Sequence, residues 1–179
     1  MNLRASYHQE AKDMVGRPTE DLGIIRVAVM YQNDFYGQPG LDGVVNALRQ
    51  RGLETAAHWH YQRNSDAVKA AVFNIVEANP QVVIIIGAYA PVAKAITAAR
   101  ENIDPIFMAV SFVSSNALAQ ELGPDGAGIY VHQVVPLPDN TSVPAVADYR
   151  AALDTFDANA EPGRIFGRLF GRVLGNHRS

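Results

Sequence analysis

The chain has 179 residues and a mass of 19.4 kDa, which is the size of one domain. Hydrophobic residues make up 48% of it and charged residues 18%, which excludes a disordered or fibrous protein. Fifteen Lys and Arg against 18 Asp and Glu give a net charge of -3. This balance argues against nucleic-acid binding, because such proteins carry a basic surface.

Cysteine content and hydropathy exclude further classes of protein. The sequence has no Cys, which excludes disulfides, thiol nucleophiles and zinc sites built on thiolates. Its longest apolar run, residues 82–86, is far shorter than the ~20 residues of a membrane helix. The first ten residues lack the apolar stretch of a secretion signal. We therefore expect a soluble globular chain without membrane insertion, and a cytoplasmic one if this sequence is the whole natural product.

The predicted helices and strands alternate along the chain. Strands are indicated by β-branched and apolar runs between breakers, and helices by apolar residues at a spacing of three to four. The strands are expected over residues 24–31, 53–61, 82–86, 105–110 and 128–135. The helices are expected over residues 5–15, 41–48, 66–77, 91–100 and 115–122.

This alternation predicts an α/β fold, an open doubly wound parallel sheet of about five strands in the order 2-1-3-4-5. Residues 82–86 have no polar interruption, as expected for a strand buried on both faces. Residues 1–138 would form this lobe. A Pro-containing linker then leads into a helical tail, residues 139–179, with helices predicted over 143–156 and 162–174.

Ligands of open α/β sheets bind beyond the carboxyl ends of the strands. Those ends carry aromatic, small and hydroxyl residues with one carboxylate, Asp34, within residues 33–37, 87–90 and 111–114. They suit stacking and hydrogen bonding to a small organic molecule. No phosphate-binding loop or dinucleotide fingerprint is present, so no nucleotide or other cofactor is expected. Asp34 as a phospho-acceptor would need further acidic residues and a Lys, so a loop aspartate is favoured.

Catalytic and metal signals are weak. His58 and His60 would share one face of a strand with Trp59 opposite, but a third metal ligand is not evident and a polar strand edge is favoured. No nucleophile elbow occurs, and Tyr7 and His8 are expected on the surface of the first helix. We expect no catalytic residues, no metal site and no enzyme activity.

Dispersed segments of the chain resemble one family. They include NLRASY at residues 2–7, VAVMYQND at 27–34 followed by Tyr36, Gly37 and Gly40, and residues 48–52, 61–64, 83–87, 110–112 and 122–124. In order and spacing these segments are similar to type I periplasmic binding proteins. The nearest branch is the leucine/branched-chain amino-acid-binding type that feeds ABC importers. The resemblance covers residues 2–162 and corresponds to the second lobe only.

The resemblance implies a solute-binding function in the periplasm. Members of the family close two α/β lobes on a ligand, so a single lobe should bind weakly alone. Matched position by position, the ligand contacts of this lobe would be Tyr36, Tyr89 and Ser111, which should converge in one cleft. Ser111 stands where amino-acid-binding members tend to have a Glu that pairs with the ligand's ammonium. A neutral amide or an aliphatic or aromatic acid therefore fits better than an α-amino acid.

Two other interpretations stay open. The chain could be a non-enzymatic interaction domain derived from such a receptor, or a small-molecule sensor, since some transcription repressors share the fold. The tail favours self-association, because Gly163, Gly167 and Gly171 line one helical face beside an apolar band. We expect a homodimer through residues 139–179.

Overall fold

The computed structural model describes residues 6–65 and 67–156. These residues belong to two compact units. One unit is Ser6–His132, and the described residues 133–156 belong to the other.

The first unit contains a five-stranded sheet in the order β2-β1-β3-β4-β5, with every neighbouring pair parallel. The predicted fold class and strand order are confirmed. The sequence-based strand limits differ from those observed by only a few residues for the first four strands. The strands are β1 (Val27–Asn33), β2 (Thr55–Gln62), β3 (Val82–Ile86), β4 (Ile106–Ala109) and β5 (Tyr130–Val131).

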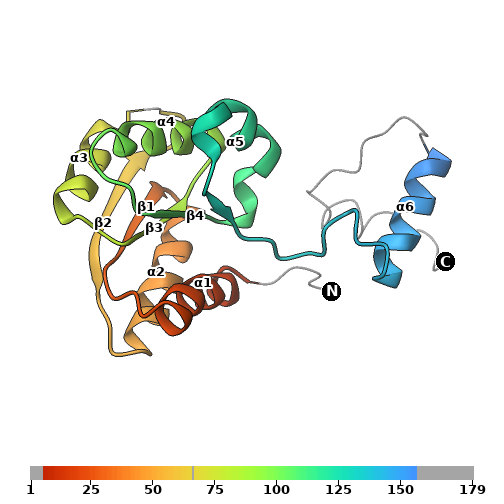
Figure 1. Ribbon diagram of the computed structural model, residues 1–179, viewed down its shortest axis with the longest axis horizontal. Helices are drawn as coiled ribbons and strands as arrows, with labels where there is room; N and C mark the ends of the chain where they lie inside the picture. The colour runs from red at the N-terminus through yellow and green to blue at the C-terminus, as the bar shows by residue number, and fades with distance from the viewer. Residues whose placement is uncertain (1–5, 66, 157–179) are drawn as a thin grey trace. The chain divides into compact units, whose positions relative to one another are not determined.

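Helices cover both faces of the sheet (Figure 1). On one face α1 (Tyr7–Gly16) and α2 (Gly37–Arg49) pack against β1 and β3. On the other face lie α3 (Lys69–Ala78), α4 (Tyr89–Arg100) and α5 (Ser115–Leu122). Three shorter helical turns complete the unit: η1 (Arg17–Asp21), η2 (Ser111–Val113) and η3 (Gly123–Gly126).

Strands β1 and β3 form the centre of the core because their side chains alternate between the two helical layers. Val29 and Ile84 belong to the cluster on the α1–α2 face, and Met30 and Ile85 to the cluster on the α3–α5 face. All four are at most 1% exposed. Burying each such side chain contributes about 1.5–3 kcal/mol, so these two strands supply a large part of the lobe's stability.

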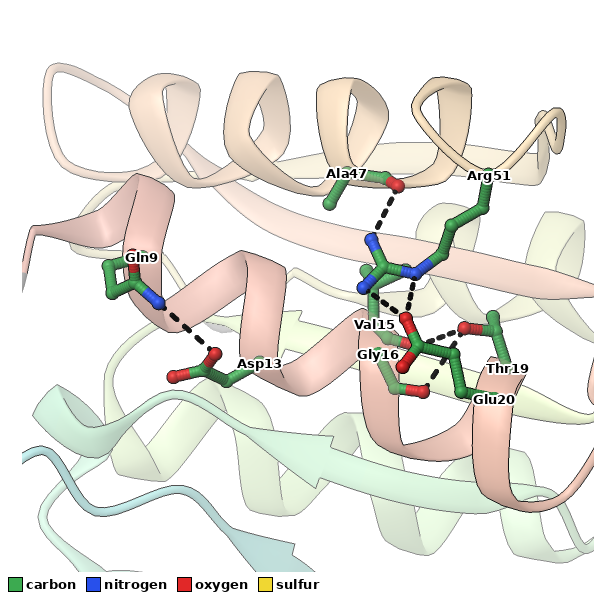
Figure 2. Close-up of polar contacts among 8 residues, drawn as sticks. All are labelled: Gln9, Asp13, Val15, Gly16, Thr19, Glu20, Ala47 and Arg51. Carbon is green, nitrogen blue, oxygen red and sulfur yellow. Dashed lines mark hydrogen bonds and ion pairs between the residues drawn. The ribbon is translucent and has the colours of Figure 1, made fainter.

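The first helix continues directly into η1, a π-helical turn that the sequence did not reveal (Figure 2). The Thr19 hydroxyl donates to the Val15 carbonyl at 2.7 Å within this turn. The Arg51 guanidinium ties the turn to the end of α2: it lies 2.6 Å from a Glu20 carboxylate oxygen and donates to the Ala47 carbonyl at 2.9 Å. Long-range contacts therefore set the shape of this segment.

The fifth strand is much shorter than the predicted range of 128–135. Tyr130 and Val131 pair with Met108 and Ala109, and the His132 N–H still donates to the Ala109 carbonyl at 2.9 Å. Beyond that point the chain enters the second unit. Since β4 offers only four residues, the parallel ladder has no further partner for residues 133–135.

The described part of the second unit contains one helix, α6 (Pro144–Phe156), which matches the first predicted tail helix. Val146 and Tyr149 are buried and pack with Val135, Val143 and Leu153. The second predicted helix, residues 162–174, and the glycine-containing face assigned to dimerisation lie outside the described residues.

Candidate functional site

The candidate site is the edge of the sheet at which β1, β3 and β4 end. These strands are adjacent and parallel, so the segments that follow them start from the same edge. Tyr36 precedes α2, Tyr89 is the first residue of α4, and Ser111 is the first residue of η2. All three predicted ligand contacts thus follow strands at this edge.

Asp34 shapes the turn that carries Tyr36. One carboxylate oxygen accepts the backbone N–H of Tyr36 at 2.9 Å and that of Gly37 at 3.0 Å, and the other accepts the Gln32 side-chain amide at 2.6 Å. Desolvation raises the pKa of Asp34, but these hydrogen bonds and the charge of Arg63 outweigh it, and the pKa is lowered. An ionised Asp34 therefore holds the backbone N–H groups of Tyr36 and Gly37 at the start of α2, which is a structural role.

Gly37 is required by a close approach of the backbone. A Cβ at this position would overlap the Gln32 carbonyl oxygen. The chain can thus reverse direction tightly after β1 only with a residue that has no side chain. This tight reversal fixes the place of Tyr36 relative to the strand end.

Tyr36 is the middle member of a row of three aromatic rings. Its ring centroid lies 5.6 Å from that of Tyr7 on α1, in an edge-to-face arrangement, and 5.3 Å from that of Phe112 in η2. Both separations are in the favourable range for aromatic pairs. Phe112 is half exposed, so the row reaches the surface. Tyr7 lies on α1 with intermediate exposure and its ring packs on that of Tyr36, while His8 is exposed as expected.

A second polar contact positions the start of α4. The buried Tyr61 hydroxyl donates to the Gln32 side-chain oxygen and accepts the Ala88 N–H, both at 3.2 Å. Burial raises the pKa of Tyr61 to about 12, so the hydroxyl keeps its proton. A Cβ on Gly87 would overlap this hydroxyl. Tyr89 follows directly and is 41% exposed.

Ser111 is held by a buried carboxylate. Glu10 on α1 is 1% exposed, and its carboxylate accepts the Ser111 N–H at 2.5 Å and lies 3.5 Å from Nδ1 of His132. Burial raises the pKa of Glu10, but the nearby His132 side chain and hydrogen bonds from Ser111 outweigh it, and the pKa is lowered. Sequence reasoning missed Glu10 because nothing local connects residue 10 with residues 111 and 132.

Two hollows elsewhere on the unit do not include the predicted ligand contacts. One, of about 650 Å³, lies along α1 and η1 and is lined by charged residues of both signs, among them Lys12, Glu20 and Arg51. The other, of about 600 Å³, lies between α1 and α2 and is lined mainly by polar residues. The mixed charge of the first hollow gives no preference for a ligand of either sign.

The groups at the strand-end edge are suited to stacking and hydrogen bonding. It offers aromatic rings and hydroxyl groups, while both of its carboxylates already hold backbone N–H groups. Among residues 6–65 and 67–156, no group of three or more His, Asp or Glu could hold a metal ion. In the same residues no helix is both long and apolar enough to cross a membrane. The fold is that of an open α/β lobe, a class of fold in which ligands bind beyond the carboxyl ends of the strands.

Comparison with known proteins gives the family. Residues 1–165 match the family described as "Periplasmic binding protein", and the chain belongs to that family. A possible leucine/isoleucine/valine-binding protein from Rhodopirellula baltica SH 1 is 33% identical, with a TM-score of 0.87 over 98% of this chain and 50% of its own. The chain finds no match among curated proteins.

More distant solved structures share the fold. An extracellular ligand-binding receptor from Verminephrobacter eiseniae is 24% identical, with a TM-score of 0.81 over 97% of this chain and 51% of its own. A leucine-binding protein from Thermotoga maritima is 16% identical, with a TM-score of 0.81 over 97% and 49%. The chain thus spans about half the length of the structures it matches, as predicted for a single lobe.

Proposed function

We propose that this lobe binds a small organic solute at the strand-end edge, with Tyr36, Tyr89 and Ser111 as its contacts. The observation that carries the proposal is the aromatic row of Tyr7, Tyr36 and Phe112, which is fixed by the Asp34 turn and reaches the surface. Aromatic rings at this edge suit the apolar part of a ligand, and the hydroxyl groups suit its polar part.

The proposed ligand is an amino acid, an amide or a small carboxylic acid. The Rhodopirellula protein is described as a possible leucine/isoleucine/valine-binding protein, which supports a ligand with a branched aliphatic group. The Ser111 side chain is neutral and cannot pair with a ligand's ammonium group, and the nearby Glu10 carboxylate already accepts the Ser111 backbone N–H. A neutral amide or an aliphatic or aromatic acid therefore suits the edge better than an α-amino acid.

Binding by this lobe alone should be weak. A ligand pocket normally encloses most of its ligand, and one sheet edge covers only one side of it. We expect a Kd of about 1 mM or weaker for the chain by itself. The proposed role is that of a receptor in the periplasm that delivers its solute to an ABC importer, without catalysis.

The test is an NMR titration of the chain with valine, leucine, leucinamide, isovalerate and phenylacetate. Chemical-shift changes should concentrate at Tyr36, Tyr89 and the 111–113 turn. Tyr89→Ala should raise the Kd at least threefold. Phe73→Ala is the matched control, because Phe73 is also an exposed aromatic side chain but lies on α3. No shifts at the edge with any ligand, or equal losses in both variants, would contradict the proposal.

The alternative is a non-enzymatic interaction domain, which Phe35 favours because this fully exposed aromatic directly precedes Tyr36. In that role the chain would form a homodimer through residues 139–179. Light scattering of the full chain at micromolar concentration separates the two roles. A monomer mass together with solute shifts supports the receptor, and a dimer without solute shifts supports the interaction domain.

A further inference from the structure

Strand β2 lies at the rim of the sheet and has an open backbone edge (Figure 1). Within Ser6–His132 its only neighbour in the sheet is β1. Its eight residues, Thr55–Gln62, contain no Pro and no charged Lys, Arg, Asp or Glu. Those are the residues with which proteins commonly block a rim strand from pairing with another chain. Among the described residues of this unit no other strand pairs with the outer edge of β2, and none of its eight residues is of a kind that blocks a further strand.

The two faces of β2 carry different exposed side chains. His58 and His60 point to the α1–α2 face: they pair with Val29 and Tyr31, which belong to the core cluster on that face. Trp59 pairs with Met30 and points to the opposite face, where it is 39% exposed. Both histidines are exposed, and the His60 ring lies 5.8 Å from that of Tyr31.

His58 and His60 supply two imidazoles at positions i and i+2 of one strand, where side chains stand on the same face. Divalent zinc is held by four ligands in a structural site, and imidazole is among its preferred ligands. The described residues of one chain offer no third ligand in a group with these two. A site on β2 thus requires ligands from another molecule.

We propose that His58 and His60 form half of a divalent metal site, completed by a second copy of the chain whose β2 pairs antiparallel with this one. With the twofold axis at Trp59, His58 stands opposite His60 of the partner subunit, and His60 opposite His58 of the partner subunit. Opposed residues have Cβ atoms about 4.5–5.5 Å apart, so the four imidazoles gather in one patch. Shifting the register by two residues either way leaves only one pair of histidines directly opposed.

The same register would also bury Trp59, which lies on the face of β2 opposite the two histidines. Trp59 would meet Trp59 of the partner subunit at the axis, which covers an aromatic side chain that is exposed in the single chain. A twofold interface of this kind closes on itself and uses the same surface on both copies. This inference is independent of the proposed solute site, which lies at another edge of the sheet.

The experiment titrates zinc into the full-length, untagged, chelator-treated chain and follows mass by light scattering. The mass should double relative to the metal-free chain, with saturation at one zinc ion per two chains. Trp59 is the only Trp in the sequence, so its fluorescence should shift to the blue at the same stoichiometry. Measuring the doubling against the metal-free chain separates it from any metal-independent dimer formed by the tail.

Three variants sharpen the result. His58→Gln and His60→Gln should each abolish the doubling and the fluorescence shift, and both side chains are exposed, so folding should be preserved. His8→Gln is the matched control, because His8 is exposed on α1 and should leave both readouts unchanged. Unchanged mass with zinc, one zinc per chain without doubling, or doubling that persists in both β2 variants would overturn the proposal.

Discussion

Two carboxylates, Asp34 and Glu10, hold the strand-end edge of this lobe in different ways. The hydrogen bonds of Asp34 go to Gln32, Tyr36 and Gly37, all within three residues of it in the chain, and its ion pair with Arg63 at 3.6 Å is its longer-range contact. Glu10 instead contacts Ser111, which is 101 residues away, and His132 at the end of the same unit. Both contacts lower the pKa of the carboxyl, yet one is a local turn and the other ties three distant segments together.

The difference shows how a single edge is built from local and distant parts. The Asp34 turn places Tyr36 through hydrogen bonds from nearby backbone N–H groups to the Asp34 carboxylate, which need no distant part of the chain. Glu10 places Ser111 only after α1, β4 and β5 have come together. The aromatic contact between Tyr36 and Phe112 then joins the turn after β1 to the turn after β4.

Among the predicted substitutions, the largest loss of stability is expected at Gly37, next to the Asp34 turn. In Gly37→Ala the added Cβ would overlap the Gln32 carbonyl oxygen, and backbone cannot move aside easily. We expect a loss of about 3 kcal/mol in the free energy of unfolding, measured by urea denaturation. Gly126→Ala is the control: its nearest neighbour would be a Leu122 carbon at 3.5 Å, so it should change stability little. Equal effects of the two substitutions would show that the close approach is absent.

The contacts that hold Ser111 from distant parts of the chain should be lost on substitution of Glu10. Glu10→Ala removes the buried acceptor of the Ser111 N–H and should cost about 2–3 kcal/mol of unfolding free energy. Glu10→Gln keeps an acceptor oxygen and should cost less. The control is Glu20→Ala on the adjoining turn, an exposed carboxylate paired with Arg51, expected to cost less than about 1 kcal/mol. If the Glu10→Ala protein were as stable as the Glu20→Ala protein, the structural role of Glu10 would be contradicted.

A double-mutant cycle can test the contact between β2 and the start of α4. Gly87→Ala should be destabilising because its Cβ would overlap the Tyr61 hydroxyl, and Tyr61→Phe should be destabilising because two hydrogen bonds are lost. Combined, the two changes should cost at least about 1 kcal/mol less than their sum, since Phe lacks the overlapping oxygen. Additive losses in thermal or urea unfolding would contradict this geometry.

The smallest effect is expected from pH. The pKa values of Glu10 and Asp34 are lowered in the folded chain from ordinary values of 4.5 and 3.8. Their stabilising contribution is therefore complete above those values and is lost as the pH falls through the lower folded pKa values. Urea midpoints measured from neutral pH to about pH 3 should fall at the acidic end. Glu10→Gln should flatten that fall, and an unchanged acid profile in this variant would assign the dependence to other groups.

The sequence alone determined the alternation of strands and helices, the order of the five strands and the interior position of residues 82–86. The alternation and the buried run follow from hydrophobic periodicity and chain breakers, which act over a few residues, whereas the strand order was predicted from the fold class that such alternation indicates. It also placed Tyr36, Tyr89 and Ser111 directly after strands, and their role in ligand binding remains a prediction.

Only the tertiary structure decided how those strand ends are held. The contact of Glu10 with Ser111 and His132, the packing of Tyr7 on Tyr36 and the two-residue length of β5 all depend on segments far apart in the chain. It also decided that His58 and His60 stand exposed on a rim strand with an open edge. Periodicity fixes which face of an element is apolar, but neighbours are chosen by packing and by the pairing of buried polar groups, which no local pattern encodes.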